Sequence, residues 1–158
     1  MQGVYPIYNC KFRIGIKGLS SGDGDMKEVA ELENLGIKID GTVETWTSMS
    51  SQGWSNSLMT GKSFSVEGKG KRSVGDPGND YIHGIAYKDG LDCNTVGDIT
   101  FPDGSKLTFN AVANVTNPGG DDATKVAPLE FTLQGQGKPV YTPAQAPKTY
   151  ANGEGKVK

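Results

Sequence analysis

The residue types that could support catalysis are few in this sequence and poorly spaced for it. His83 is the only histidine among 158 residues, and no cysteine lies close to it in the sequence. Cys10 and Cys93 are the two cysteines and lie far apart, whereas a structural zinc site takes four ligands. A nucleophile also needs an adjacent base, which one histidine and scattered serines do not supply. We therefore expect no catalytic residues, no enzyme activity and no metal site.

The phosphate-binding and ion-binding patterns in the sequence are also incomplete. Residues 60–63 read TGKS, like the end of a phosphate-binding loop, but that loop requires a glycine at position 56, where the sequence has Asn56. The stretch GKGKRSVG fails the dinucleotide-binding pattern and precedes no βαβ unit. The acidic stretches GDGD and GGDD lack the spaced oxygen ligands of an EF-hand. We therefore expect no cofactor.

Composition narrows the class of protein further. The net charge is −2 and the isoelectric point about 5.4, whereas a nucleic-acid-binding domain usually has a pI above about 9. The 23 glycines and 8 prolines indicate many turns, as in an all-β domain. No apolar run approaches the roughly 20 residues that span a bilayer, and the N-terminus lacks the pattern of a signal peptide. We expect an intracellular protein without a disulfide.

Strict alternation of apolar and polar residues predicts strands along most of the chain. The expected strands run through residues 11–17, 37–46, 63–71, 99–101, 107–115 and 129–133. The simplest packing is a mainly β fold of two packed antiparallel sheets, as a β-sandwich or a partly open barrel, with one flanking helix at about residues 77–88. One domain would span residues 1–138, followed by a flexible C-terminal tail at residues 139–158.

The helix is predicted from its ends and from one apolar stripe. Asp76 is a favourable N-cap, and Pro77 suits the first helical position because its missing N–H would be unpaired there anyway. We expect Gly90 to end the helix in the left-handed conformation. The stripe consists of Tyr81, Ile82, Ile85 and Ala86. Because a helix of about ten residues is marginal alone in water, this stripe must pack on the sheet.

A long loop is expected where the alternation stops, at residues 47–62. Loops of this length are usually functional or disordered, and disordered segments are poor in aromatic residues. The candidate contact residues are Trp46, Met49, Trp54, Leu58, Met59 and Lys62. Since Trp is enriched at interface hot spots and Met adapts to irregular surfaces, we expect this loop to dock on another subunit. The alternative is that it folds back on its own sheet.

The order of these features resembles the major tail tube protein of long-tailed bacteriophages. The resemblance rests on the helix entry in EGKGKRSVGDPGNDYIHGIAYKDG, on the hairpin ITFPDGSKLTF that follows it, and on the closing segment LEFTLQGQGKP. It covers most of the chain from Ile7 to Pro139. Related folds form the inner tubes of contractile tails and of type VI secretion systems.

This resemblance implies a structural function. Copies would form hexameric rings that stack into a virion tail tube, through which genomic DNA passes without specific binding, and residues 47–62 would reach an adjacent ring. The implied partners are other copies, the tail-length tape measure protein, the tail terminator and the distal tail or baseplate proteins. Assembly would take place in the host bacterial cytoplasm, without membrane insertion. We expect Lys69, Lys71 and Arg72 at subunit contacts or ring rims.

Two other functions remain open at this stage. One is the inner tube of a contractile tail or secretion system, which the sequence separates poorly from the first function. The other is a monomeric β-sandwich module that binds a ligand such as a sugar on an aromatic platform. The sequence also leaves open which strand face would line a channel.

Overall fold

The computed structural model describes residues 2–144. Its strands are β1 (Lys11–Gly15), β2 (Met26–Glu28), β3 (Leu32–Trp46), β4 (Asn56–Lys71), β5 (Asn94–Thr100), β6 (Lys106–Asn117), β7 (Pro128–Gly135) and β8 (Val140–Thr142). The α-helix is α1 (Pro77–Ile85), and the short 3₁₀ helices are η1 (Ile7–Asn9), η2 (Gly18–Ser20), η3 (Asp23–Asp25), η4 (Met49–Ser51) and η5 (Gly90–Cys93).

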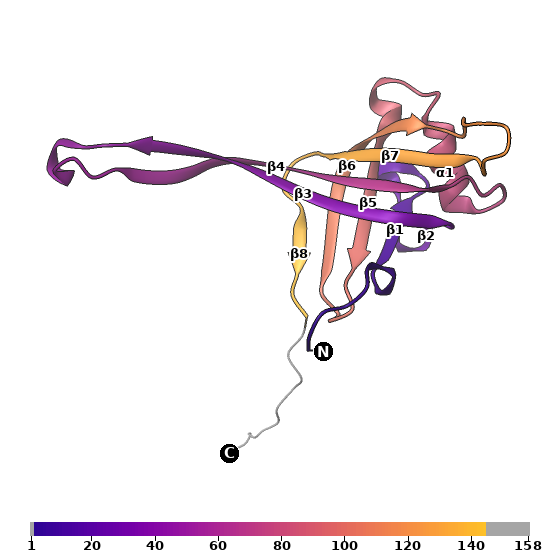
Figure 1. Ribbon diagram of the computed structural model, residues 1–158, viewed down its shortest axis with the longest axis horizontal. Helices are drawn as coiled ribbons and strands as arrows, with labels where there is room; N and C mark the ends of the chain where they lie inside the picture. The colour runs from indigo at the N-terminus through magenta and orange to yellow at the C-terminus, as the bar shows by residue number, and fades with distance from the viewer. Residues whose placement is uncertain (1, 145–158) are drawn as a thin grey trace, which may run out of the picture.

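The eight strands form one antiparallel sheet that curls around a single core (Figure 1). The strand order is β2-β1-β5-β6-β7-β4-β3, with β8 paired to the start of β6. Phe12 on β1 stacks against Phe131 on β7 with ring centroids 6.2 Å apart, although β5 and β6 separate these strands in the sheet. The expected mainly β fold with one flanking helix is confirmed. Its strands are joined in one curled sheet, as in the partly open barrel, instead of two separate sheets.

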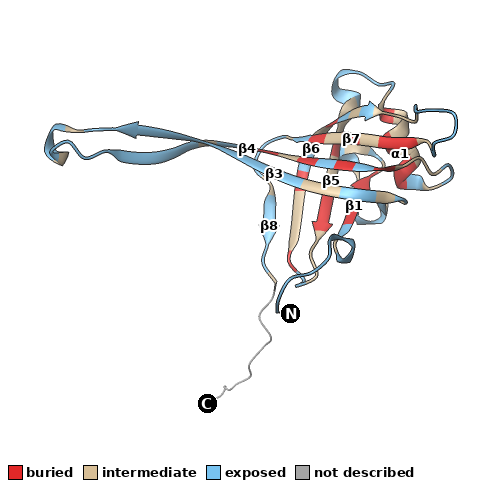
Figure 2. Ribbon diagram, viewed as in Figure 1, coloured by how far each residue is buried: buried red, intermediate tan, exposed pale blue. Residues whose placement is uncertain are grey.

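The core is built from the inward-facing side of the alternating strands. It contains Phe12, Ile14, Val29, Phe64, Val66, Ile82, Ile85, Ile99, Phe109, Ala111, Ala113, Leu129, Phe131 and Leu133. Gly68 and Gly135 lie directly against the rings of Phe131 and Phe64, so a side chain at either glycine would collide with an aromatic ring. Buried residues are confined to the body of the molecule in Figure 2, and a long pair of strands outside it is exposed.

Helix α1 begins as predicted and ends earlier. The Asp76 carboxylate accepts a hydrogen bond from the Asn79 N–H at 3.0 Å, which makes it the N-cap, and Pro77 is the first helical residue. After Ile85 the chain makes i→i−3 hydrogen bonds up to Lys88 instead of helical ones, because the last turn tightens into 3₁₀ geometry. Gly90 adopts the expected left-handed conformation with a φ of 58°, but it begins η5 and does not end α1.

The apolar stripe of α1 meets the curled sheet. Ile82 and Ile85 lie in the core, Tyr81 packs at its margin, and Ala86 is half-buried. The helix contacts β6, β2 and β1.

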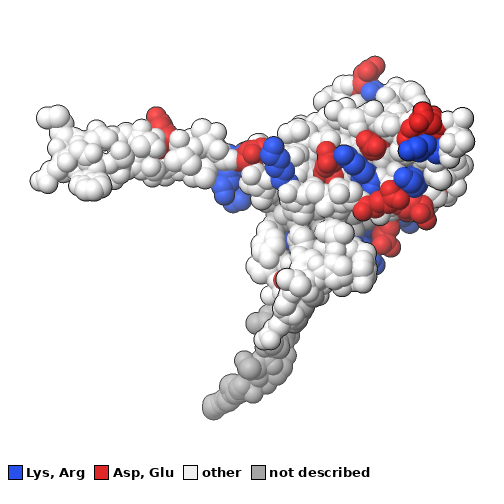
Figure 3. Space-filling view, in the orientation of Figure 1, with Lys and Arg blue, Asp and Glu red and all other residues white. Residues whose placement is uncertain are grey.

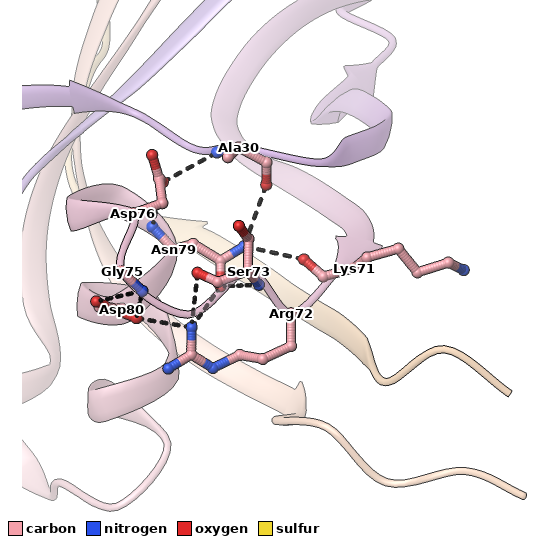
Figure 4. Close-up of polar contacts among 8 residues, drawn as sticks. All are labelled: Ala30, Lys71, Arg72, Ser73, Gly75, Asp76, Asn79 and Asp80. Atoms are coloured by element: carbon pink, nitrogen blue, oxygen red, sulfur yellow. Dashed lines mark hydrogen bonds and ion pairs between the residues drawn. The ribbon is translucent and has the colours of Figure 1, made fainter. Parts of the chain in front are cut away.

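One buried asparagine joins α1 to the base of the β3–β4 hairpin (Figure 4). The Asn79 amide nitrogen donates to the carbonyl oxygens of Ala30 at 3.1 Å and Lys71 at 2.9 Å. Its amide oxygen accepts from the Ser73 N–H at 3.0 Å and from Arg72 at 2.8 Å. Asn79 is fully buried, and all four hydrogen-bonding positions of its side chain are satisfied. The residues before β3 and after β4 are thereby held at a fixed distance from the helix.

The basic residues before the N-terminus of α1, Lys69, Lys71 and Arg72, differ in their burial and in their contacts. Arg72 is mostly buried, and its guanidinium contacts the Asp80 carboxylate at 2.7 Å (Figure 4). The charge of Arg72 is therefore paired within the chain, and the expectation that Lys69, Lys71 and Arg72 lie at subunit contacts or ring rims stays a prediction. Lys71 pairs with Glu33 at 3.2 Å, and Lys69 is exposed.

The C-terminal part of the fold contains a strand that the sequence analysis did not assign. Residues 140–142 lie in the expected tail, but they form β8, which pairs with residues 106–108 of β6. The remainder of that tail from residue 145 lies outside the described residues.

Substituting Asn79→Ala should lower the free energy of unfolding by about 3 kcal/mol, because it leaves several buried backbone groups and Arg72 without a partner. Urea unfolding followed by circular dichroism measures this loss. The matched control is Asn56→Ala at an exposed strand position, which should change stability by less than about 0.5 kcal/mol. Equal stability of the two variants would contradict the role given to Asn79.

Stability should fall at acidic pH, in part because of Asp80. The hydrogen bond from Arg72, supported by the Gly75 N–H, lowers the pKa of Asp80 below its ordinary value. A carboxyl group whose pKa is lower when folded stabilises the native state above its unfolded pKa of about 3.9, and this stabilisation disappears as the pH falls through the folded pKa. Asp80→Asn should have a lower free energy of unfolding than the wild type at pH 7. That free energy should also decrease less between neutral pH and pH 2, as measured by urea unfolding. If the free energy of unfolding decreased equally with acid in the variant and the wild type, this role of Asp80 would be contradicted.

Candidate functional site

The most prominent surface feature is a two-stranded arm that extends from the body (Figure 1). Strands β3 and β4 contain 15 and 16 residues. Since β4 pairs with β7 only through residues 65–71, residues 39–63 have no sheet partner outside the β3–β4 hairpin within the described part of the chain. These residues are called the arm below. Every residue of the arm is exposed except Ser48, Ser51 and Gly61, which are half-buried.

The expected loop at residues 47–62 is wrong as a description of secondary structure. Strand β3 continues to Trp46 and β4 begins at Asn56, so the connection is short. A β-bulge interrupts the alternation of apolar and polar residues in β4. The register shifts after the pair Thr42–Gly61 and leaves Thr60 unpaired. The hairpin also lacks a buried face, so its sequence shows little of the apolar periodicity by which strands are recognised.

The tip of the arm is a well-ordered turn. Ser51 Oγ accepts from the Ser48 N–H at 3.1 Å and donates to the Ser48 carbonyl at 2.8 Å. The Trp54 N–H donates to the Ser51 carbonyl at 3.0 Å, and Gly53 supplies a φ of 89°, which glycine adopts without strain. The turn displays Met49 and Trp54, with exposed fractions of 101% and 80%. These side chains are presented on a backbone that is already ordered.

The predicted contact residues all lie on the arm, distributed over its two faces. Directly paired residues of antiparallel strands project from the same face. Val43 pairs with Met59, whose sulfur lies against Gly41. The core-side face of the arm, which continues the core face of β4 at Phe64, contains Ile39, Val43 and Met59. The opposite face contains Trp46 and Leu58, since Leu58 pairs with Glu44 two positions from Trp46.

Two of these apolar residues were missed as contact candidates. The sequence shows Ile39 and Val43 on one side of an alternating strand, but that pattern is typical of a half-buried strand with its apolar face covered. In the structure this side is exposed, with Ile39 at 63% and Val43 at 54%. The alternative in which the segment folds back on its own sheet is wrong, because the arm extends into solvent.

Charge is nearly absent from the outer part of the arm (Figure 3). Residues 45–61 include no ionisable side chain, whereas Asp40, Glu44 and Lys62 lie closer to the body. Lys62 is exposed at the root of the arm. The outer arm therefore offers apolar, hydroxyl and amide groups, which suit a neutral partner surface.

A second open surface is the face of the sheet opposite the core. On β3, β4 and β7 this face contains polar side chains, among them Lys38, Ser65, Glu67, Thr132 and Gln134. Lys38 and Asp40 approach to 3.8 Å, and both remain exposed. This face is suited to contact with water.

The catalytic and metal-binding residue types are dispersed in the structure. Within residues 2–144, no three His, Cys, Asp or Glu side chains are grouped to hold a metal ion. Cys10 and Cys93 are free and half-buried, and burial raises the pKa of the Cys10 thiol. His83 packs edge-on against Tyr87 at 5.6 Å. In the same described part of the chain, no helix has the length and apolar character needed to cross a membrane.

Comparison with known proteins gives both a family and a fold. Residues 16–141 match the family described as phage tail tube protein. No curated protein matches the chain. One similar solved structure is the tail of an empty GTA particle, obtained with helical refinement and C6 symmetry, with a TM-score of 0.66. Another is the virion of a native gene transfer agent particle, with a TM-score of 0.64. In each case identity is 17%, and the match covers 89% of this chain and 100% of the other.

Removal of the arm should leave the body folded, because arm residues do not enter the core. The arm-shortened variant replaces residues 42–61 with Asn-Gly, which joins the paired residues Gly41 and Lys62 through a two-residue hairpin turn. Its free energy of unfolding should stay within about 1 kcal/mol of the wild type, by urea unfolding and circular dichroism. A variant that is unfolded or insoluble would show that the body depends on the arm.

Proposed function

The chain belongs to the phage tail tube protein family, and we propose that it assembles with copies of itself into stacked hexameric rings that form a tube for DNA delivery. The family is structural and not enzymatic, so the function is to be sought in surfaces instead of a catalytic site. The proposal includes a location in the virion tail.

The observation that carries this proposal is the exposed arm. Met49 and Trp54 at its tip, and Trp46, Leu58 and Met59 along it, are accessible to solvent in the isolated chain. Large exposed apolar patches mark interaction sites, and tryptophan in particular is enriched among interface hot spots. In a stack of rings, the arm of each subunit would be covered by subunits of the adjacent ring. This contact joins different surfaces of the two copies, so it can be repeated without limit along a tube.

Lateral contacts would use the two ends of the sheet. Strands β3 and β2 are the terminal strands in the sheet order, so each has one edge whose backbone groups have no strand partner among residues 2–144. Such edges can pair with another strand, and pairing between neighbours would join the sheets of a ring. The C6 symmetry used for the similar GTA tail supports a ring of six.

The channel would be lined by the polar sheet face. This face presents hydroxyl, amide and mixed charged side chains on β3, β4 and β7, and α1 lies on the other side with the core. Because clusters of Lys and Arg bind phosphates and retard DNA, a face with both signs of charge suits the passage of DNA. This channel wall would bind DNA weakly and without sequence preference.

Other partners would act at the ends of the tube or inside it. We include the tape measure protein, the tail terminator and the distal tail or baseplate proteins, and assembly in the host bacterial cytoplasm. At each tube end, the surfaces used for stacking would remain open on the last ring. The end-specific proteins would therefore recognise arms at one end and the surfaces that receive arms at the other.

Electron microscopy and light scattering of concentrated protein test this function. The wild type should form rings or hollow tubes, whereas the arm-shortened variant and Trp54→Ser should remain small and folded, because they remove the stacking contact. Trp54→Phe keeps an aromatic ring at the tip and should retain assembly. Wild type that stays monomeric at every concentration, or tubes formed equally well by the arm-shortened variant, would contradict the proposal.

A further inference from the structure

The arm has apolar side chains on both of its faces at the same distance from the body. We infer that each arm is inserted between two other copies of the chain, which cover its two faces separately. The inference rests on the proposed function and adds the number and placement of the partners. A ribbon that lay on a single partner would need apolar residues on one face only.

The hydrogen-bond register places the two apolar sets back to back. Val43 and Met59 are directly paired and project from the core-side face. The next pair outward is Glu44 and Leu58, so Leu58 projects from the opposite face because successive residues of a strand alternate. Trp46 lies two positions further along that same face. The apolar groups are therefore separated by no more than the thickness of one sheet layer.

The β-bulge at Thr60 determines which of the apolar β4 side chains lies on which face of the arm. In an uninterrupted register, Thr60 would oppose Val43 and Met59 would oppose Glu44. The extra residue shifts β4 by one position, which pairs Met59 with Val43 and places Leu58 beside Glu44. The bulge thus places Met59 with Val43 on the core-side face and Leu58 with Trp46 on the other face, where an uninterrupted register would exchange Met59 and Leu58. Bulges commonly redirect side chains in this way.

Both faces are similarly exposed in the isolated chain. On the core-side face Met59 is 48% exposed, and on the opposite face Trp46 is 47% and Leu58 60% exposed. Nearer the body, the opposite face is polar at Lys38 and Asp40, as is typical of a sheet face in contact with water. The change from polar to apolar on that face therefore begins with the outer arm.

The occupants of both faces are copies of this chain. Each copy has one arm, so a tube built from this chain contains as many arms as subunits, and proteins present only at tube ends are too few to cover them. Residues 45–61 contain no charge, and Glu44, which pairs with Leu58, would repel DNA, so a largely neutral protein surface suits the outer arm. The body offers neutral apolar surface for such contacts, since Val4, Ile7, Tyr8, Val140 and Tyr141 are exposed.

Photo-crosslinking distinguishes one partner from two. A tagged subunit with benzoylphenylalanine at position 43, at position 58, or at both is diluted into a large excess of wild type and assembled into tubes. Each single label should give a tagged dimer, and the double label should give a tagged trimer. Only dimers from the double label would show that both faces touch one copy and would overturn the inference. A single label that gives no crosslink would overturn it too.

Polar substitution of each face gives an independent test. Val43→Thr with Met59→Gln alters the core-side face, and Trp46→Thr with Leu58→Gln alters the opposite face. Each pair should raise the protein concentration required for assembly by about tenfold or more, while Ser57→Thr, a polar change on the arm, should not. Normal assembly after either paired substitution would overturn the inference. Failure of the wild type to form tubes would instead contradict the proposed function itself.

Discussion

A two-stranded ribbon cannot bury its own apolar side chains, and this constraint governs the molecule. Residues 39–63 have hydrogen-bond partners across the hairpin but no covering layer on either face. An isolated hairpin is at best marginally stable in water, and burial of apolar surface contributes roughly 25 cal/mol per Å². The arm therefore gains its full stabilisation only when other molecules cover it. The proposed self-assembly would cover a surface that the fold leaves open.

The body has the complementary property, because its interactions are satisfied internally. Asn79 connects the residues flanking β3 and β4 to α1. Across the sheet, Asp98 is buried and accepts two hydrogen bonds from Arg13, while Lys106 approaches the same carboxylate at 3.5 Å. The hydrogen bonds to Asp98 also raise the pKa of Arg13. These links hold the helix, the body ends of β3 and β4, and strands β1, β5 and β6 together within the body.

Much of the secondary structure of the body can be predicted from the sequence, whereas most of that of the arm cannot. Alternating strands and the cap at Asp76 are local signals, and the structure confirms them. The strand nature of residues 56–62 was missed because Thr60 interrupts the register and neither face is buried. The internal use of Arg72 could not be foreseen, since its partner Asp80 is brought to it by the turn into the helix. The candidate contact residues were chosen by their aromatic and methionine types and stay predictions, and their division between two faces required the pairing register.

Tryptophan fluorescence tests the central claim most directly, because Trp46 and Trp54 are the only tryptophans in the sequence and both lie on the arm. Their emission and its quenching by acrylamide therefore report only on the arm, in the free chain and in tubes. The account predicts emission typical of solvent-exposed indole in the free chain, and a shift to shorter wavelength with reduced quenching on assembly. Tubes whose tryptophans remain as accessible to acrylamide as those of the free chain would contradict it.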